Sequence, residues 1–334
     1  MKYIHVDDEQ SLIFRECHLP EVAQDECLVK VKAIGVNRAD LLQRAGKYPA
    51  PKGESTILGL EVSGEIVQCG EQVGSNPFQQ PWKVSDKVFG LVAGGAYAEY
   101  VKVKAAHLLP LPKAFTFEQG AASAEVFLTA YQSLFTIASL KAGSKVLIHA
   151  GASGVGSAAI QLAKAKDCYV VVTVGSDVKA QACLALGADV AINYQNTDFV
   201  AWSKENLSSG FNVILDVVAG DYLEKNVKVA ALDCHVVMLS MLGGRYCSQL
   251  DIAKLLAKRL TLSASTLRNR SDSYKSELVS HFINDFYNQF ESKNITPLID
   301  TTFPWSNVEL AHQKMANNEN IGKLVLTLSD NGED

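Results

Sequence analysis

The chain contains 334 residues, of which 48% are hydrophobic and 20% are charged, so it is a globular protein with enough apolar side chains for about two domains. Its formal net charge is -5, from 31 basic and 36 acidic side chains, which argues against a surface built to neutralise nucleic-acid phosphates. No apolar run approaches the length of a membrane span, and the N-terminus turns acidic at once, so we expect a cytoplasmic protein without a membrane partner.

The first 110 residues contain short β-type runs separated by turn residues. Alternating apolar and polar side chains predict half-buried antiparallel strands at 27–35, 64–67 and 97–103. The glycine- and proline-containing stretch at 70–82 predicts an exposed loop. This part of the chain is therefore expected to be mainly β.

A strand–helix–strand pattern begins near residue 120. A short apolar strand at 146–148 precedes a glycine-rich turn, and a β-branched run at 169–174 is typical of a parallel strand buried on both faces. The alternation predicts a doubly wound sheet. Further strands are expected at 190–193, 213–218, 236–240, 260–264 and 323–328, and helices at 155–163, 177–187, 274–290 and 308–317. We expect the last strand to return to the N-terminal domain.

The glycine-rich turn at 150–156 matches G-x-G-x-x-G at Gly151 and Gly156, with Ser153 at the middle glycine position. A strand ends before this turn and a helix begins within it. The unpaired N–H groups and the positive dipole end of such a helix bind a pyrophosphate. The pattern predicts a dinucleotide site, and its alternative is a tight turn without a ligand.

The end of the second strand bears on the choice of cofactor. An NAD site carries an acid about 20 residues after the turn, where it binds the ribose 2′-hydroxyl. Here Gly175 and Ser176 end the strand, and Asp177 is more typical of the first turn of a helix. With Ser176 as donor and Lys179 as countercharge, the site favours NADPH over NADH. The alternative for Lys179 is a solvated helix lysine.

The seven cysteines and seven histidines show no C-x-x-C or H-E-x-x-H spacing, so no metal site is predicted. We expect the cysteines to be reduced and mostly packed thiols.

Several motifs together resemble one family. They are V-N-R-A-D-L at 36–41, Q-R-A-G-K-Y at 43–48, I-L-G-L-E-V-S-G at 57–64 and the turn at 148–156. They are similar to the zinc-independent quinone oxidoreductase, or zeta-crystallin-like, branch of the medium-chain dehydrogenase/reductase superfamily. Y-L-E-K-N at 222–226, S-T-L-R-N-R at 265–270 and N-I-G-K at 320–323 most resemble its tumour-suppressor-inducible subgroup.

The resemblance implies an α/β protein with two domains. Residues 1–122 and 267–334 would form a GroES-like, mainly-β catalytic domain, and residues 123–266 a Rossmann domain with a doubly wound parallel sheet. It also implies a homodimer. Zinc-dependent relatives carry a histidine where Leu60 stands and a metal-binding cysteine at Val36-Asn37, and they have a four-cysteine lobe that this chain lacks. Position 42 is leucine, where some members carry an active-site tyrosine.

The resemblance also implies site residues. Asn37 and Tyr48 are expected as catalytic residues beside the nicotinamide, in the cleft between the domains. Cofactor binding is expected from Thr129, Ala152, Ser153, Gly154, Val155, Gly175, Ser176, Lys179, Tyr194, Ser240, Leu242, Gly243, Thr266, Leu267 and Arg268.

The expected activity is NADPH-dependent reduction of quinones without zinc or flavin. Alcohol oxidation at neutral pH needs a group that handles the hydroxyl proton, whereas quinones and activated enones accept reducing equivalents readily. An enone or enoyl-thioester reductase on the same fold is the alternative. An RNA-binding or crystallin-like structural role is a minor one, since the chain has no basic stripe interleaved with aromatic residues.

Overall fold

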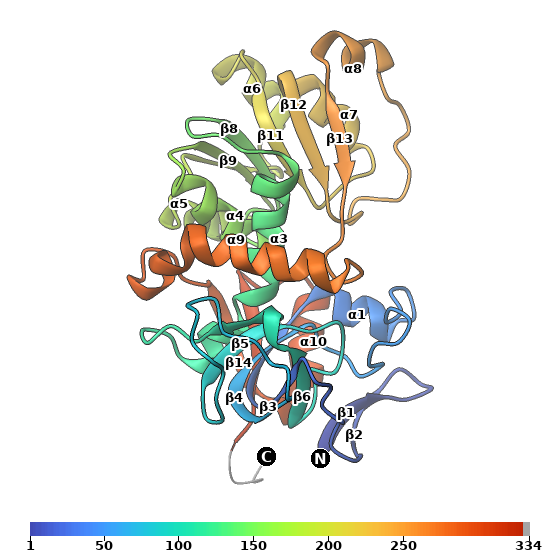
Figure 1. Ribbon diagram of the computed structural model, residues 1–334. Coiled ribbons are helices and arrows are strands. Elements are labelled where there is room, and N and C mark those ends of the chain that lie inside the picture. The colour runs from blue at the N-terminus through green and yellow to red at the C-terminus, as the bar shows by residue number, and fades with distance from the viewer. Residues whose placement is uncertain (330–334) are drawn as a thin grey trace. The chain divides into compact units, whose positions relative to one another are not determined.

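The computed structural model describes residues 1–329 (Figure 1). The chain divides into two compact units: the first unit contains residues 1–128 and the C-terminal part from Leu267, and the second unit contains Thr129–Thr266. The chain first passes from the first unit to the second inside helix α3 (Ala124–Tyr131), whereas we expected this boundary after residue 122. A helix that runs through the crossing leaves no linker composition for sequence analysis to detect.

The first unit is built on a seven-stranded sheet with the order β14-β15-β3-β4-β5-β7, in which β6 also pairs with β3. A separate antiparallel hairpin is formed by β1 (Lys2–Val6) and β2 (Leu12–Glu16). The sheet strands are β3 (Glu26–Val36), β4 (Glu61–Cys69), β5 (Lys87–Leu91), β6 (Tyr100–Lys104), β7 (Leu108–Pro110), β14 (Ile299–Pro304) and β15 (Lys323–Thr327). The helices are α1 (Arg38–Arg44), α2 (Phe117–Ala121), α3, α9 (Asp272–Glu291) and α10 (Val308–Ala316), with 3-10 turns at Ala105–His107 and Trp305–Asn307.

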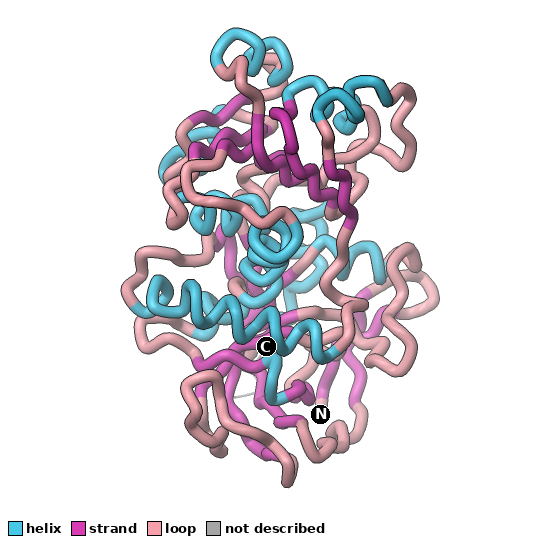
Figure 2. The backbone as a smooth tube through the Cα atoms, turned by 45° about the horizontal axis from the view of Figure 1, so that its top comes forward, coloured by secondary structure: helices cyan, strands magenta, loops and turns pink. Residues whose placement is uncertain are grey.

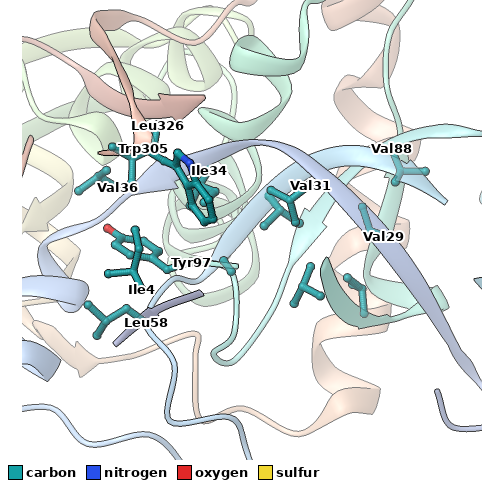
Figure 3. Packing of buried hydrophobic residues seen from close by; sticks show 14 of the residues in the cluster. Ile4, Val29, Val31, Ile34, Val36, Leu58, Val88, Tyr97, Trp305 and Leu326 are labelled. Atoms are coloured by element: carbon teal, nitrogen blue, oxygen red, sulfur yellow. The ribbon is translucent and has the colours of Figure 1, made fainter. Parts of the chain in front are cut away.

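The core of the first unit joins both ends of the chain. Strand β15 pairs antiparallel with β3, with Leu324 opposite Val36, so the last strand returns to the N-terminal domain as expected. Apolar side chains from β3, from the loops and from the C-terminal segment form one cluster, in which Ile34, Tyr97 and Trp305 pack together (Figure 3). This burial of apolar surface stabilises the sheet.

The second unit is a six-stranded parallel sheet with the order β10-β9-β8-β11-β12-β13. Its elements are β8 (Lys145–His149), α4 (Gly154–Lys164), β9 (Tyr169–Val174), α5 (Asp177–Ala185), β10 (Val190–Asn193), α6 (Phe199–Asn206), β11 (Phe211–Asp216), α7 (Tyr222–Val229), β12 (Ala230–Met238), α8 (Ile252–Lys258) and β13 (Thr261–Ala264), after a π-helical turn at Gln132–Ile137. Figure 2 shows the alternation of strands in magenta and helices in cyan. The predicted fold class is confirmed.

The strand order reverses at β8. The chain proceeds from β8 through β9 to β10 in one direction and then places β11 on the other side of β8. Such a switch point, at the carboxyl ends of the strands, is where open α/β sheets bind their ligands. The short helices α6, α7 and α8 were missed by sequence analysis. Helix α8 buries no residue, so it has no apolar stripe to detect.

Among residues 1–329, no helix is both long and apolar enough to cross a membrane.

Candidate functional site

The glycine-rich turn lies at the switch point of the second unit (Figure 1). Helix α4 begins at Gly154, and its N-cap Ser153 accepts a hydrogen bond from the Gly156 N–H at 3.0 Å. A Cβ on Gly151 would lie 2.6 Å from the Val172 Cβ, and one on Gly156 would lie 2.4 Å from the Ala150 carbonyl oxygen. Both glycines are therefore required for close packing of strand and helix, as a dinucleotide-binding turn demands.

A buried hydrogen-bonded network lies next to this turn. His149 Nδ1 lies 2.9 Å from Thr173 Oγ1, and His149 Nε2 lies 2.8 Å from Asn226 Oδ1. Asn226 Nδ2 donates to Asp216 Oδ2 at 2.8 Å, and Asp216 Oδ1 accepts from the Val218 N–H at 2.7 Å. This hydrogen-bonded network thus connects the carboxyl ends of β8, β9 and β11.

The direction of these hydrogen bonds defines which ring nitrogen of His149 carries the proton. Because Asn226 turns its amide nitrogen to Asp216, its oxygen faces His149 and accepts a hydrogen bond from Nε2–H. Nδ1 then accepts from the Thr173 hydroxyl. Burial lowers the pKa of His149, which keeps the imidazole neutral. Sequence analysis included position 149 only within the turn motif at 148–156 and missed this role of His149.

The end of strand β9 carries the residues expected around the ribose. Ser176 is the N-cap of α5 and accepts from the Lys179 N–H at 3.3 Å, so its hydroxyl proton is still able to donate. Asp177 Oδ1 accepts from Asn193 Nδ2 at 2.7 Å. A Cβ on Gly175 would lie 2.5 Å from the Tyr194 hydroxyl oxygen.

An open cavity of about 220 Å³ lies beside Tyr194 and is also lined by Phe199, Tyr222 and Lys225. Lys225 pairs with Asp198 at 2.6 Å, which leaves the aromatic rings as the main apolar walls. The cavity is smaller than a typical ligand pocket, so it fits one ring of a larger ligand rather than the whole.

The segment at 239–243 is the third loop at this edge of the sheet. It runs alongside the end of β11, with Leu239 N–H donating to Asp216 O at 2.8 Å and Gly243 N–H donating to Val218 O at 2.7 Å. Strands β8, β9 and β12 are parallel and end at the same edge. The structure therefore brings together the predicted residues that follow these strands: Ala152, Ser153, Gly154, Val155, Gly175, Ser176, Ser240, Leu242 and Gly243. Thr129 is buried in α3, and Thr266 is exposed beyond β13.

Asn37 and Tyr48 belong to the first unit, together with Leu267 and Arg268. Asn37 is buried, and its amide group is fully engaged. Nδ2 donates to Glu61 Oε1 at 2.9 Å and to the Gly35 carbonyl at 3.2 Å, while Oδ1 accepts from Lys323 Nζ at 2.7 Å. An amide with both protons committed to protein groups favours a positioning role over direct contact with a substrate.

Next to Asn37 lies a second buried network. Asp40 Oδ2 accepts from the Asn37 N–H at 2.7 Å and from the Tyr97 hydroxyl at 3.2 Å. The Tyr97 oxygen also lies 3.0 Å from His312 Nε2. Burial raises the pKa of Asp40 to about 6 and lowers the pKa of His312 to about 4.

Arg268 carries an unusual buried charge. Its side chain is 5% exposed, and Nε donates to the Ala93 carbonyl at 2.7 Å. Neither terminal guanidinium nitrogen has a hydrogen-bond partner among the described residues. The guanidinium lies over the ring of the half-buried Tyr48, 5.5 Å from its centroid. Because buried polar groups are nearly always paired, these two nitrogens point to a ligand.

Leu60, at the position of the zinc ligand histidine, is buried. Within residues 1–329, no group of three or more His, Cys, Asp or Glu side chains is arranged to hold a metal ion. Leu42 is exposed at the position where some relatives carry a tyrosine.

Comparison with known proteins supplies the family. A model for the alcohol dehydrogenase GroES-like domain matches residues 23–113, and one for the zinc-binding dehydrogenase matches residues 154–283. The chain belongs to the medium-chain dehydrogenase/reductase superfamily. Membership of this superfamily makes it an oxidoreductase of that type.

Relatives in the superfamily carry two kinds of name. The zebrafish (Danio rerio) synaptic vesicle membrane protein VAT-1 homolog is 29% identical over 92% of this chain, and the chain spans 65% of that protein's length. The mouse (Mus musculus) quinone oxidoreductase is 28% identical over 93% of this chain and 91% of its own length. The structure of Escherichia coli quinone oxidoreductase complexed with NADPH is 28% identical, with a TM-score of 0.83 over 98% of this chain and 99% of that one. The resemblance to the tumour-suppressor-inducible subgroup stays a prediction.

Proposed function

We propose that the chain reduces quinones with NADPH. The observation that carries the proposal has two parts: the two glycines of the turn after β8 cannot accept a Cβ, and the next strand, β9, is followed by Gly175 rather than by an acid. Two similar proteins are named quinone oxidoreductase, one of them in complex with NADPH. This similarity supports both the cofactor and the class of acceptor.

The second unit fits the cofactor. The N–H groups of Ala152, Gly154 and Val155 around the start of α4 would bind the pyrophosphate, with the helix dipole assisting, while the Ser153 N–H already donates to the Ala150 carbonyl at 2.9 Å. The Ser176 hydroxyl and the Lys179 side chain would bind the 2′-phosphate, since Asp177 is already paired with Asn193. Tyr194 and the cavity beside it would hold part of the adenosine. When bound, the nicotinamide supplies the hydride.

The first unit would bind the acceptor and the nicotinamide end. We propose that the Arg268 terminal nitrogens donate to a carbonyl oxygen there and that the Tyr48 hydroxyl and ring contact the acceptor. Asn37 acts as a positioning residue, because Glu61 and Lys323 occupy its amide. We propose that catalysis needs no zinc, since Leu60 and Asn37 cannot replace a histidine and a cysteine as ligands.

An acceptor panel tests the function. NADPH oxidation is followed by absorbance with a simple quinone, an enone and a crotonyl thioester, each at matched concentrations. We expect turnover of the quinone to exceed that of the thioester. A higher kcat/KM for the thioester would instead establish the enoyl-reductase alternative. No turnover with any acceptor, together with a salt-sensitive gel shift of AU-rich RNA, would support the binding-protein alternative.

We also propose that the chain forms a homodimer through the edge of the second unit's sheet. Strand β13 ends the sheet, and the neighbouring helix α8 exposes Ile252 and Leu256. Unpaired edges and exposed apolar side chains are features of association surfaces. Light scattering after size exclusion tests this, and a monomer at assay concentration contradicts it. Leu256→Lys is expected to shift the mass toward the monomer.

A further inference from the structure

Two cysteines face each other at one end of the first unit's sheet. Cys27 on β3 lies opposite Cys69 on β4 in the antiparallel register, and their Sγ atoms are 3.8 Å apart. The backbone that leads into Cys27 and away from Cys69 is hydrogen-bonded across the two strands: the Gly70 N–H donates to the Glu26 carbonyl at 2.9 Å and the Gln72 N–H donates to the Gln24 carbonyl at 2.8 Å. The two sulfur atoms are therefore neighbours because of the strand register.

The strand register also defines whether Cys27 and Cys69 form a hydrogen-bonded or a non-hydrogen-bonded cross-strand pair. The bond from Gly70 to Glu26 connects the residues that flank Cys27 and Cys69, so the two cysteines are a non-hydrogen-bonded pair. Residues in such a pair have Cα atoms about 4.5 Å apart, the closest approach in an antiparallel sheet. This separation lies within the range that disulfides accept. Rotation of the side chains could bring the sulfur atoms into bonding distance without a new backbone arrangement.

The two thiols differ in access. Cys27 is fully buried in the core cluster, and burial raises its pKa far above the ordinary range. Cys69 is half-buried at the end of its strand. A small oxidant in solution therefore reaches Cys69 first, and the thiol of Cys27 is placed to react second.

We propose that Cys27 and Cys69 form an oxidation site that a peroxide converts to a disulfide. The Cys69 thiolate attacks one oxygen of hydrogen peroxide, which forms a sulfenic acid and, after protonation, releases water. The Cys27 sulfur then attacks the Cys69 sulfur, the S–S bond forms, and the sulfenic hydroxyl leaves with the Cys27 proton as a second water. Two thiols lose two electrons and two protons, and one peroxide becomes two waters.

The site lies away from the residues proposed for function. Asn37 follows the far end of β3 and Glu61 begins β4, whereas Cys27 and Cys69 lie at the opposite ends of these strands. The disulfide would close the segment that carries Asn37, Tyr48 and Glu61 into a covalent loop. Cross-links of this kind stabilise mainly by restricting the unfolded chain. We therefore expect the oxidised protein to unfold at a higher temperature, with the quinone kcat of the reduced protein retained.

Peptide mapping tests the proposal directly. Trypsin releases Cys27 within peptide 16–30, which also contains Cys17, and releases Cys69 within peptide 53–83. The experiment is therefore done on the Cys17→Ser variant, where a link between the two peptides can only involve Cys27. After one equivalent of hydrogen peroxide under native conditions, we expect the linked peptides by mass spectrometry and the loss of two of the remaining thiols. Dithiothreitol should reverse both changes and the rise in melting temperature.

Two variants in the same background serve as controls. Cys69→Ser should lose the linked peptides and the thermal shift, and Cys247→Ser, which removes another half-buried cysteine, should retain both. A sulfenic or sulfinic acid accumulating on Cys69 without a link to Cys27 would overturn the proposal. So would an oxidised protein whose six thiols all remain titratable after denaturation.

Discussion

Lys323 and Glu61 form an ion pair in which both side chains are buried, with Nζ 2.7 Å from Oε1. The ammonium group also donates to the Val36 carbonyl and to Asn37 Oδ1, each at 2.7 Å, so all three of its protons are used. The other Glu61 oxygen accepts from the Glu125 N–H at 2.8 Å. The pair therefore joins β15 to β3, β4 and α3 within the first unit.

Breaking this pair from one side should be costly. Lys323→Met leaves the Glu61 carboxylate buried without its cation, and we expect the free energy of unfolding to fall by about 3–5 kcal/mol. The double variant Lys323→Met, Glu61→Leu should recover much of that loss, because neither buried charge remains. Urea denaturation measures both. As a surface control, Lys228→Met removes the exposed pair with Glu224 and should change stability by about 0.5 kcal/mol or less. Equal effects at both sites would contradict the interpretation.

The network of Asp40, Tyr97 and His312 predicts opposing pH dependences. The folded pKa of Asp40 is raised from 3.8 to about 6, so in this window the folded state holds a proton that the unfolded state has lost, and stability falls as pH rises. The folded pKa of His312 is lowered from 6.5 to about 4, so the unfolded state binds the proton and stability rises with pH. Each effect amounts to about 3 kcal/mol when complete.

Urea denaturation between pH 4 and 6.5 separates these two contributions. Relative to the parent protein, Asp40→Asn should make the slope of stability against pH more positive, and His312→Gln should make it more negative. Unchanged slopes in both variants would show that neither group titrates as its burial implies.

Lys179 predicts the preference for NADPH. A hydrogen bond to a charged group contributes about 1.5–3 kcal/mol, or about 10- to 150-fold in affinity. Lys179→Ala should therefore raise the KM for NADPH at least about tenfold and leave the KM for NADH nearly unchanged. Rising salt should weaken NADPH more than NADH. Equal use of NADH and NADPH by the parent protein would contradict the interpretation of this strand end.

Introducing the missing acid is the converse test. Gly175→Asp should shift preference toward NADH, because a carboxylate repels the 2′-phosphate and binds the ribose. A Cβ at this position approaches the hydroxyl of Tyr194, whose side chain is exposed and able to turn away. Tyr194→Phe is the control variant, since it removes that hydroxyl without adding an acid. If both variants change the NADPH to NADH ratio equally, the effect comes from Tyr194 and not from the acid.

The pair of Arg268 and Tyr48 predicts separate effects on function and stability. Arg268→Gln removes a buried charge whose terminal nitrogens have no described protein partner, and the glutamine amide can replace Nε as the donor to the Ala93 carbonyl, so we expect little loss in melting temperature. The KM for NADPH or for the quinone should rise at least about tenfold. Tyr48→Phe keeps the ring and tests the hydroxyl alone, and Tyr48→Ala removes both. Loss of stability without a change in KM would assign Arg268 a structural role, and parental turnover by Tyr48→Ala would remove Tyr48 from the site.

Metal removal should leave activity unchanged. Leu60 cannot ligate zinc, and Asn37 already shares its amide with Glu61 and Lys323. Prolonged dialysis against a chelator is therefore expected to leave the quinone kcat as it was, with metal content followed by mass spectrometry. Stoichiometric zinc, lost together with activity and restored with it, would contradict the proposal.

Local patterns in the sequence determined most of the fold. The β-branched run of β9 and the strand–turn–helix around Gly151 and Gly156 have their own periodicity and steric demands, so they predicted the parallel sheet and its switch-point turn. The absence of an acid at Gly175 was equally visible. Short elements such as α8 were not predicted, because they bury too little apolar surface to show a helical periodicity of hydrophobic residues.

Only the tertiary structure decided which distant residues meet. Lys323 contacts Asn37 across 286 positions of sequence, Arg268 reaches the Ala93 carbonyl across 175, and Cys27 lies opposite Cys69 because of one strand register. Sequence analysis expected Asn37 among the catalytic residues, whereas its hydrogen bonds favour a positioning role. Such contacts depend on strand order and register, and a shift of one residue in a strand would turn side chains such as those of Cys27, Cys69 and Lys323 to the opposite face of the sheet.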